Sequence, residues 1–218
     1  MNFIDIHTHH LKDENGISII NHTLGRDSEP LNTENQYYSV GIHPWYLQNP
    51  NQLFELLNKY IKNPNFIAVG ECGIDKFSQF SMELQKEVFI NHIKIAEEIQ
   101  KPIIVHCVKA FNELIRIKKD SKSTVPWIIH GFNANRNILE ECLKHGFYFS
   151  VGNKAISNIT QNFSVVTRIP LEKLFLETDD AHISIQTIYK QVSDITGVLL
   201  DKLKETVFNN FIKVFKPT

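Results

Sequence analysis

Short runs of consecutive apolar residues recur along the chain, and each is followed at once by polar residues. Continuous apolar runs are typical of strands that are covered on both faces, as in parallel sheets. The pattern predicts eight strands, which are Phe3–Ile6, Ile17–Ile20, Tyr37–Val40, Phe66–Val69, Ile103–Val105, Trp127–Ile129, Phe147–Val151 and Leu174–Leu176.

Between the later runs, apolar residues recur at helical spacing. Helices are predicted around residues 53–61, 84–99, 111–115, 138–143 and 159–166, and two more close the chain at 188–195 and 203–214. The stripe at 138–143 stops before Gly146, and glycine commonly ends a helix.

Alternation of strands and helices predicts a parallel sheet, and eight strands indicate an α/β protein with a (β/α)8 TIM-type barrel. The 218 residues fall short of the about 250 typical of such barrels. Residues 7–16 are too few for a helical crossover between the first two strands. We therefore expect a single domain over residues 1–218, with helices reduced around the first three strands. An open doubly wound sheet is the alternative.

Composition narrows the class of protein. A net charge of −1 argues against a broad basic surface for duplex DNA or anionic membranes, and it leaves local contact with a phosphate group open. No apolar run reaches the length of a membrane span, and the N-terminus has no signal-peptide pattern. Three widely spaced cysteines indicate reduced thiols. These features predict a cytoplasmic protein with no membrane partner, and the thinly covered strands are a candidate contact for a homo-oligomer.

Metal-ligating residue types follow five of the predicted strands. Asp5, His7 and His9 share one face of the first strand because successive side chains alternate. Carboxylates and imidazoles also follow later strands, at Glu71, His106, His130 and Asp179. Strand ends converge at one end of a barrel, so the set predicts a site for a first-row divalent metal.

Each of these residues also has an ordinary structural explanation. Glu71 between glycines suits a turn, Asp179 suits a helix N-cap, and a lone histidine after a strand is commonly a hydrogen-bonded core residue. Coincidence at five strand ends is much less plausible than at one, which favours the metal site.

The sequence resembles the TatD-related metal-dependent hydrolases, or TatD DNases, of the amidohydrolase superfamily. The matching segments run in family order: Asp5-Ile-His7-Thr-His9, Gly41-Ile-His43-Pro44-Trp45, Gly70-Glu71-Cys-Gly73-Ile-Asp75, Pro102-Ile-Ile-Val-His106, Ile129-His130-Gly131-Phe132, Gly146-Phe-Tyr-Phe-Ser-Val-Gly152 and Leu176-Glu177-Thr178-Asp179.

The resemblance implies two divalent metal ions, of which Zn, Mn, Ni and Mg suit the ligands. By motif, His7, His9 and Asp179 would hold one cation, His106 and His130 the other, and Glu71 would bridge them. Glu71 and Asp179 would be catalytic, with Asp179 orienting a water and taking its proton. These roles are expectations that come from the resemblance.

Three further residues receive roles beside the ligands. Asp5 is expected to brace a metal ligand from behind. His43 is interpreted as a substrate or leaving-group contact, the alternative being a turn fixed by Pro44. The family commonly has a basic residue directly after the His106 position; here Lys109 stands further along and is the expected substrate contact.

Candidate phosphate partners are other cationic residues that follow predicted strands, namely Lys76, Arg136 and Lys154.

The predicted activity is hydrolysis of an ester bond, namely phosphodiester cleavage of DNA by a deoxyribonuclease. The substrate would be DNA or short nucleic acid ends, since near-neutral charge suits a strand end better than long duplex. A metal-dependent phosphatase or amide or ester hydrolase of a small metabolite is the alternative, and a non-catalytic metal- or nucleotide-binding barrel is a third.

Overall fold

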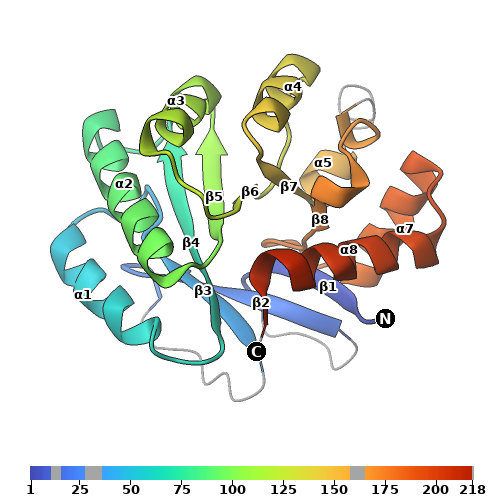
Figure 1. Ribbon diagram of the computed structural model, residues 1–218, viewed down its shortest axis with the longest axis horizontal. Helices are drawn as coiled ribbons and strands as arrows, with labels where there is room; N and C mark the ends of the chain where they lie inside the picture. The colour runs from blue at the N-terminus through green and yellow to red at the C-terminus, as the bar shows by residue number, and fades with distance from the viewer. Residues whose placement is uncertain (11–15, 28–35, 158–164, 218) are drawn as a thin grey trace. The chain divides into compact units, whose positions relative to one another are not determined.

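The apolar runs form strands, and helices follow most of the later ones. The computed structural model describes residues 1–10, 16–27, 36–157 and 165–217. In chain order (Figure 1) the elements are β1 (Phe3–Thr8), β2 (Gly16–Thr23), β3 (Tyr37–Gly41), α1 (Pro50–Tyr60), β4 (Phe66–Asp75), α2 (Met82–Ile99), β5 (Ile103–Val108), α3 (Phe111–Ser121), β6 (Trp127–Ile129), α4 (Arg136–Lys144), β7 (Tyr148–Val151), α5 (Asn153–Ser157), η1 (Leu171–Lys173), β8 (Leu174–Leu176), α7 (Ile185–Thr196) and α8 (Leu200–Phe215).

The eight predicted strands are confirmed, and they follow one another in the sheet in the order of the sequence. The pairs β1–β2, β3–β4, β4–β5 and β7–β8 are parallel. The α/β topology with parallel strands in sequential order is that of a (β/α)8 barrel and not of a doubly wound sheet, whose strand order is permuted.

Several strands extend beyond their apolar runs. β1 continues through His7, and β4 continues to Asp75 in register with β5, where Gly73 pairs with His106. Candidate site residues therefore lie within these strands and not after them. Backbone pairing continues through polar residues because the ladder uses main-chain groups, and side-chain polarity does not interrupt it.

The helices agree with their predicted positions. α4 ends at Lys144, and Gly146 follows with a left-handed φ of 78°, as the glycine predicted. Within the described ranges no helix lies between β1 and β2 or between β2 and β3. Most of the helix predicted at 159–166 falls outside the described residues.

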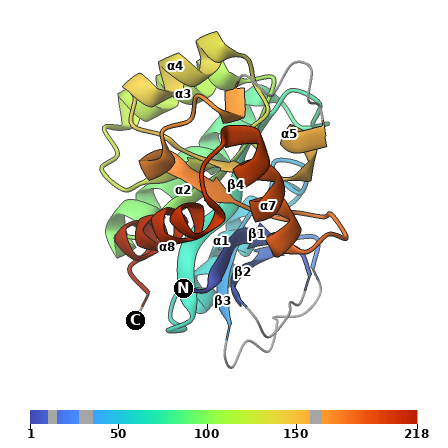
Figure 2. The same ribbon diagram turned by 90° about the vertical axis from the view of Figure 1, so that its right-hand side faces the viewer.

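The chain divides into two compact units. The first contains residues 1–20 and 129–217. In it β8 is followed by Asp179, whose N–H donates to the carbonyl of His7, so β1 lies beside the end of β8. Asn210 of α8 donates to the carbonyls of Leu171 and Leu174, and Tyr189 of α7 bonds the backbone of Ile4. Figure 2 shows α7 and α8 next to β1.

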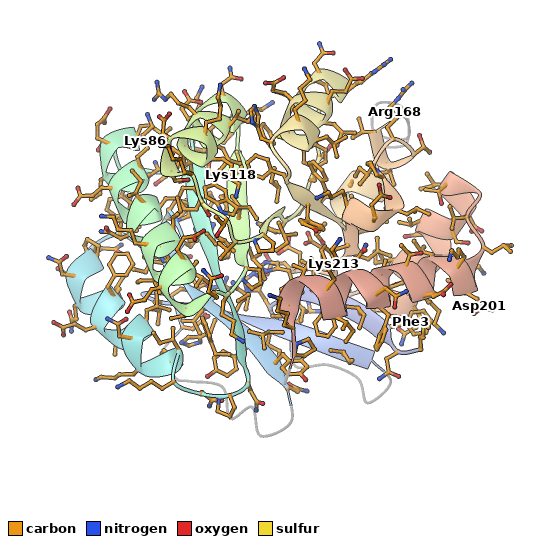
Figure 3. The ribbon with its side chains drawn as sticks, in the orientation of Figure 1. Phe3, Lys86, Lys118, Arg168, Asp201 and Lys213 are labelled. Carbon is orange, nitrogen blue, oxygen red and sulfur yellow. The ribbon has the colours of Figure 1, made fainter. Side chains whose placement is uncertain are left out.

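The second unit contains residues 21–128, with β3, β4 and β5 side by side. All ten residues of β4 are buried, and α2 packs on this strand (Figure 1). Phe89 of α2 and Trp127 make an edge-to-face pair with ring centroids 5.2 Å apart. The ammonium of Lys118, labelled on α3 in Figure 3, lies 4.5 Å from the centre of the same indole. That the whole chain is one domain stays a prediction.

The three cysteines, Cys72, Cys107 and Cys142, are free thiols. Burial raises the pKa of Cys142 to about 12, and it also raises the pKa of Cys72. In the part of the chain that the structure describes, no helix has the length and apolar character needed to cross a membrane.

Candidate metal sites

The first cluster joins the end of β1 to the residues after β8. Nε2 of His7 and Nε2 of His9 lie 3.8 and 3.6 Å from Oδ1 of Asp179. The backbone fixes this arrangement, because the N–H of Asp179 donates to the carbonyl of His7 and the N–H of His9 donates back to that of Asp179. The alternation of β1 and its pairing with the β8 end therefore bring these three predicted residues together.

His130 and Glu177 belong to the same unit and extend this cluster. The rings of His130 and His7 have centroids 4.4 Å apart, and Nδ1 of His130 lies 3.6 Å from Oε1 of Glu177. Glu177 is buried and accepts a 2.7 Å hydrogen bond from the N–H of Gly131. Ligand atoms of His130, Glu177 and Asp179 lie within 4.8 Å of one another. The assignment of His130 to the second cation stays a prediction.

Asp5 bonds Thr178, the residue next to Asp179, and its expected bracing role stays a prediction. Its Oδ1 accepts from the N–H of Thr178 at 3.1 Å, and its Oδ2 accepts from the Thr178 hydroxyl at 2.7 Å. Both residues are buried. Thr178 stands between Glu177 and Asp179, so the Asp5 carboxylate holds the backbone that carries two of the cluster's carboxylates.

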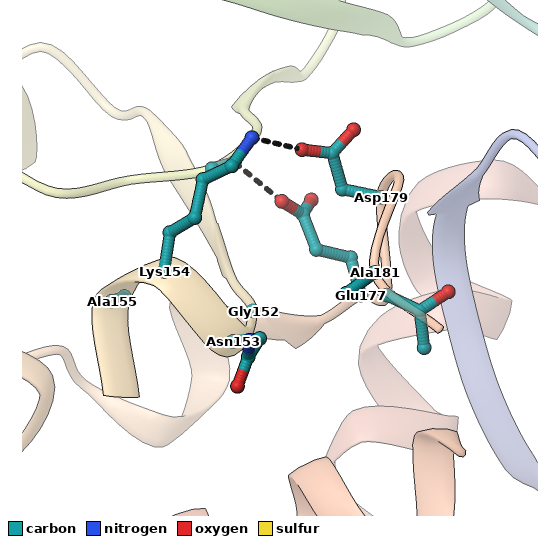
Figure 4. A pocket seen from close by; sticks show the side chains of 9 residues that line it. Gly152, Asn153, Lys154, Ala155, Glu177, Asp179 and Ala181 are labelled. Atoms are coloured by element: carbon teal, nitrogen blue, oxygen red, sulfur yellow. Dashed lines mark hydrogen bonds and ion pairs between the residues drawn. The ribbon is translucent and has the colours of Figure 1, made fainter. Parts of the chain in front are cut away.

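Lys154 reaches this cluster from α5, as Figure 4 shows. Its Nζ donates to Oδ2 of Asp179 at 3.0 Å, and both residues line a small pocket with Gly131 and Glu177. Burial raises the pKa of Asp179, but attraction to His7, His130 and Lys154 outweighs it, and the pKa is lowered overall. Asp179 is therefore held as a carboxylate, the form that ligates a cation.

The second cluster lies on β3, β4 and β5. Oε1 of Glu71 is 2.6 Å from Nδ1 of His106 and 3.5 Å from Nε2 of His43. Asn21 orients the glutamate from the other side, since its amide donates to Oε2 at 3.4 Å and its Oδ1 accepts from the N–H of Glu71 at 2.8 Å. The bridging role expected for Glu71 stays a prediction.

His43 is better suited to proton or hydrogen-bond donation than to ligation. The N–H of Trp45 donates to Nδ1 of His43 at 3.2 Å, so the neutral ring carries its proton on Nε2, which faces Glu71. A cation at Nε2 would need the lone pair that this tautomer lacks. The contact of His43 with substrate or leaving group stays a prediction.

Asp75 joins the second cluster from the end of β4. Its Oδ2 lies 3.1 Å from Nε2 of His106 and accepts from Nε1 of Trp45 at 2.8 Å, while Oδ1 accepts from the N–H of Phe77. Burial raises the pKa of Asp75, and these hydrogen bonds, that of His106 first, lower it further than burial raises it. Asp75 is thus a buried carboxylate directed at a predicted ligand.

Glycine permits the close approach of β4 to β5 at this point. Gly73 has a φ of +152°, and a Cβ there would overlap the backbone carbonyl of His106, its partner across the strands. Any larger residue would push β5 away and move His106 from Glu71. The Gly70-Glu71-Cys72-Gly73 segment therefore allows β4 and β5 to pack closely and also carries the predicted ligand Glu71.

The donor sets fit divalent cations. Two ligands at normal metal–nitrogen and metal–oxygen distances lie about 3 Å apart, close to the 3.8 and 3.6 Å that separate His7 and His9 from Asp179 in the first cluster. In His106, both ring nitrogens face carboxylates, and a neutral ring has only one N–H. A cation at Nδ1 beside Glu71 would leave the N–H on Nε2 for Asp75, which is the usual outer support of a metal-bound histidine.

The remaining predicted residues differ in their placement. Lys109 is exposed just after β5, with a left-handed φ of 55°, and its substrate role stays a prediction. Arg136 pairs with Glu140 on α4, whereas Lys154 contacts a carboxylate of the first cluster.

Sequence reasoning missed three residues that orient the clusters: Asn21, Asp75 and Glu177. Asp75 and Glu177 stand in the quoted motifs and could have been found there. Asn21 gave no local signal.

A parallel (β/α)8 topology that carries His and carboxylate clusters at its strands is typical of metal-dependent hydrolases. The sequence model of the TatD-related DNase family matches residues 22–216, and the chain belongs to this family of metal-dependent hydrolases.

Among curated relatives, the chain is 27% identical over 198 residues to the uncharacterized metal-dependent hydrolase YcfH of Escherichia coli K12, covering 84% of this chain and 74% of that protein. It is 29% identical over 177 residues to the 3'-5' ssDNA/RNA exonuclease TatD of Edwardsiella piscicida, covering 76% of this chain and 67% of that protein.

Two solved structures share the fold. The TatD homologue YjjV of Escherichia coli K12 aligns with a TM-score of 0.81 at 21% identity, covering 98% of each chain. A TatD family hydrolase of Entamoeba histolytica aligns with a TM-score of 0.80 at 19% identity, covering 100% of this chain and 99% of that one. The predicted TIM-type barrel fold is thereby confirmed.

Proposed function

We propose that this metal-dependent hydrolase cleaves phosphodiester bonds at the ends of single-stranded nucleic acids, with two divalent cations as cofactors. The supporting observation is that each of the two units contains His and carboxylate ligand atoms within 4.8 Å of one another. A relative named as a 3'-5' ssDNA/RNA exonuclease, at 29% identity, supports the substrate class.

The residues divide into ligands and groups that act on substrate. His7, His9 and Asp179 would hold one cation, and Glu71 and His106 the other. Bound divalent cations polarise a phosphoryl oxygen and lower the pKa of a water. Asp179, whose carboxylate lies beside His7 and His9, can accept a proton from that water. His43, with its proton on Nε2, can donate to the leaving oxygen.

The charge of the protein favours the end of a nucleic acid strand over a long duplex as the substrate. The net charge of −1 offers little general attraction for a long polyanion, while Lys154 offers one ammonium beside the Asp179 carboxylate. A phosphate bound beside Asp179 would contact the ammonium of Lys154.

The test combines metal counting with a substrate panel. Calorimetric titration of the apoprotein with Zn²⁺ or Mn²⁺ is expected to show two sites, and His106→Ala is expected to lose one of them. The control is His145→Ala on α4, which is bonded to Glu141 away from the clusters.

Turnover is then measured on an end-labelled single-stranded oligonucleotide, sugar phosphates, dihydroorotate-like rings and lactones. Release of nucleotides from the labelled strand supports the proposal. Hydrolysis of the other compounds alone would overturn it in favour of a metabolite phosphatase or an amide or ester hydrolase. Fewer than two bound cations with no hydrolysis at all would indicate a non-catalytic binding protein.

A further inference from the structure

Trp45 is exposed but rigidly held. Its side chain is 47% exposed, whereas the other tryptophan, Trp127, is fully buried. The indole Nε1 donates to Oδ2 of Asp75 at 2.8 Å, and the ring stands nearly perpendicular to that of His43, with centroids 5.8 Å apart. The polar edge is therefore satisfied by protein, and the exposed part of the residue is mainly aromatic surface.

The same carboxylate ties Trp45 to the second cluster. Oδ2 of Asp75 contacts both Nε1 of Trp45 and Nε2 of His106. Indole, carboxylate and imidazole thus form one hydrogen-bonded row that ends at Glu71. These hydrogen bonds fix the position of the Trp45 ring relative to the predicted ligands Glu71 and His106. An exposed aromatic residue without such bonds would have no fixed position.

The segment after β4 adds a second exposed aromatic residue and nearby cations. Phe77 is 71% exposed, its N–H donates to Oδ1 of Asp75, and Ser78 donates to the carbonyl of Pro44 beside Trp45. Lys76 and Lys109 are both exposed, and the N–H of Lys76 bonds the carbonyl of Val108 next to Lys109. Aromatic surface beside lysines matches a ligand that combines planar rings with phosphates.

We propose that Trp45 is the platform on which a base of an unpaired nucleic acid strand stacks, next to the second cluster. The inference rests on the proposed function and names the part of the substrate that this site recognises. Stacking accepts every base because each has a π face, so Trp45 supplies affinity without sequence specificity.

Fluorescence reports this stacking directly, because Trp127 is buried and Trp45 is the only other tryptophan. The full chain carrying Asp179→Asn, chosen to prevent turnover, is titrated with tetrathymidylate. Glu71 and Asp75 place negative charge beside the indole, and this charge would repel the strand. Zn²⁺ is therefore present throughout to offset it. A strand of the same length and charge with four abasic sites serves as the matched ligand.

Saturable quenching by tetrathymidylate, with little by the abasic strand, supports the proposal. Equal quenching by both strands, or none by either, overturns it.

Kinetics of variants separate stacking from the hydrogen bond to Asp75. Trp45→Ala is expected to raise KM for the oligonucleotide about tenfold with a small change in kcat. Trp45→Phe keeps a ring but loses the N–H, so most of the affinity should remain. Ile90→Ala, an exposed apolar residue on α2, is the control and should leave KM unchanged.

If Trp45→Phe loses as much as Trp45→Ala, the indole acts through Asp75 and the stacking proposal is wrong. Oligonucleotide hydrolysis that is insensitive to Trp45→Ala also overturns it while leaving the proposed function intact. Quenching specific to the base-containing strand without hydrolysis of any phosphodiester would instead support stacking and contradict the proposed function.

Discussion

The imidazole of His106 lies between two carboxylates: Nδ1 is 2.6 Å from Oε1 of Glu71, and Nε2 is 3.1 Å from Oδ2 of Asp75. A cation beside Glu71 and a proton shared with Asp75 would satisfy both ring nitrogens at once. Asp75 is then a positioning residue, which sets the orientation of His106 and increases its basicity.

We expect Asp75→Asn to weaken divalent cation binding at the second cluster by about 10- to 100-fold, because the amide is a weaker acceptor for the imidazole N–H. Titration calorimetry with Zn²⁺ measures the effect. Asp120→Asn, an exposed substitution on α3, is the control and should bind cations as the wild type does. Unchanged affinity in Asp75→Asn would show that Asp75 does not support His106.

Glu71→Ala and His106→Ala should each abolish turnover while the fold remains. The expected loss in kcat is at least about 1000-fold, since each removes a ligand on which activation of water depends. Circular dichroism and thermal unfolding check that folding is intact. Activity close to that of the wild type in either variant would remove the second cluster from the reaction.

Lys154→Gln tests the ammonium that bonds Asp179. We expect KM for a phosphodiester to rise about five- to tenfold, and the dependence of KM on salt to weaken by about one charge, because one phosphate contact is lost. Lys190→Gln, an exposed lysine on α7, is the matched substitution and should alter neither quantity. A salt dependence identical to that of the wild type would contradict a phosphate contact at Lys154.

His92 gives the fold a pH dependence that is separate from the clusters. Its Nε2 accepts from the N–H of Ile42, its Nδ1 bonds the carbonyl of Val88, and burial lowers its pKa from 6.5 to about 4. Between these values the unfolded chain binds a proton that the folded chain does not. Stability is therefore full above pH 6.5 and falls as the pH drops toward 4, by on the order of 3 kcal/mol from this residue.

The measurement is the free energy of unfolding in urea between pH 4 and 7.5, compared with His92→Gln, which cannot titrate. The wild-type value should fall more steeply than that of the variant in this range. Parallel curves would mean that His92 titrates alike in both states.

The local pattern of apolar residues and glycines was sufficient to predict many of the strands and helices. Runs such as Phe66–Val69 and Trp127–Ile129 predict strands from composition and length alone, and Gly146 predicts the end of α4. The pairing of His7 with His9 follows from the two-residue period of a strand. These features depend on neighbours in sequence, so the sequence by itself determined them.

Tertiary structure decided which side chains orient the predicted ligands. Asn21 contacts Glu71 across 50 positions, and Asp75 contacts His106 across 31. These meetings depend on strand register, which shifts between Val69 and Cys72 where β4 pairs with β5. A shift of one residue turns a side chain to the opposite face, and it is set by packing that no local pattern records.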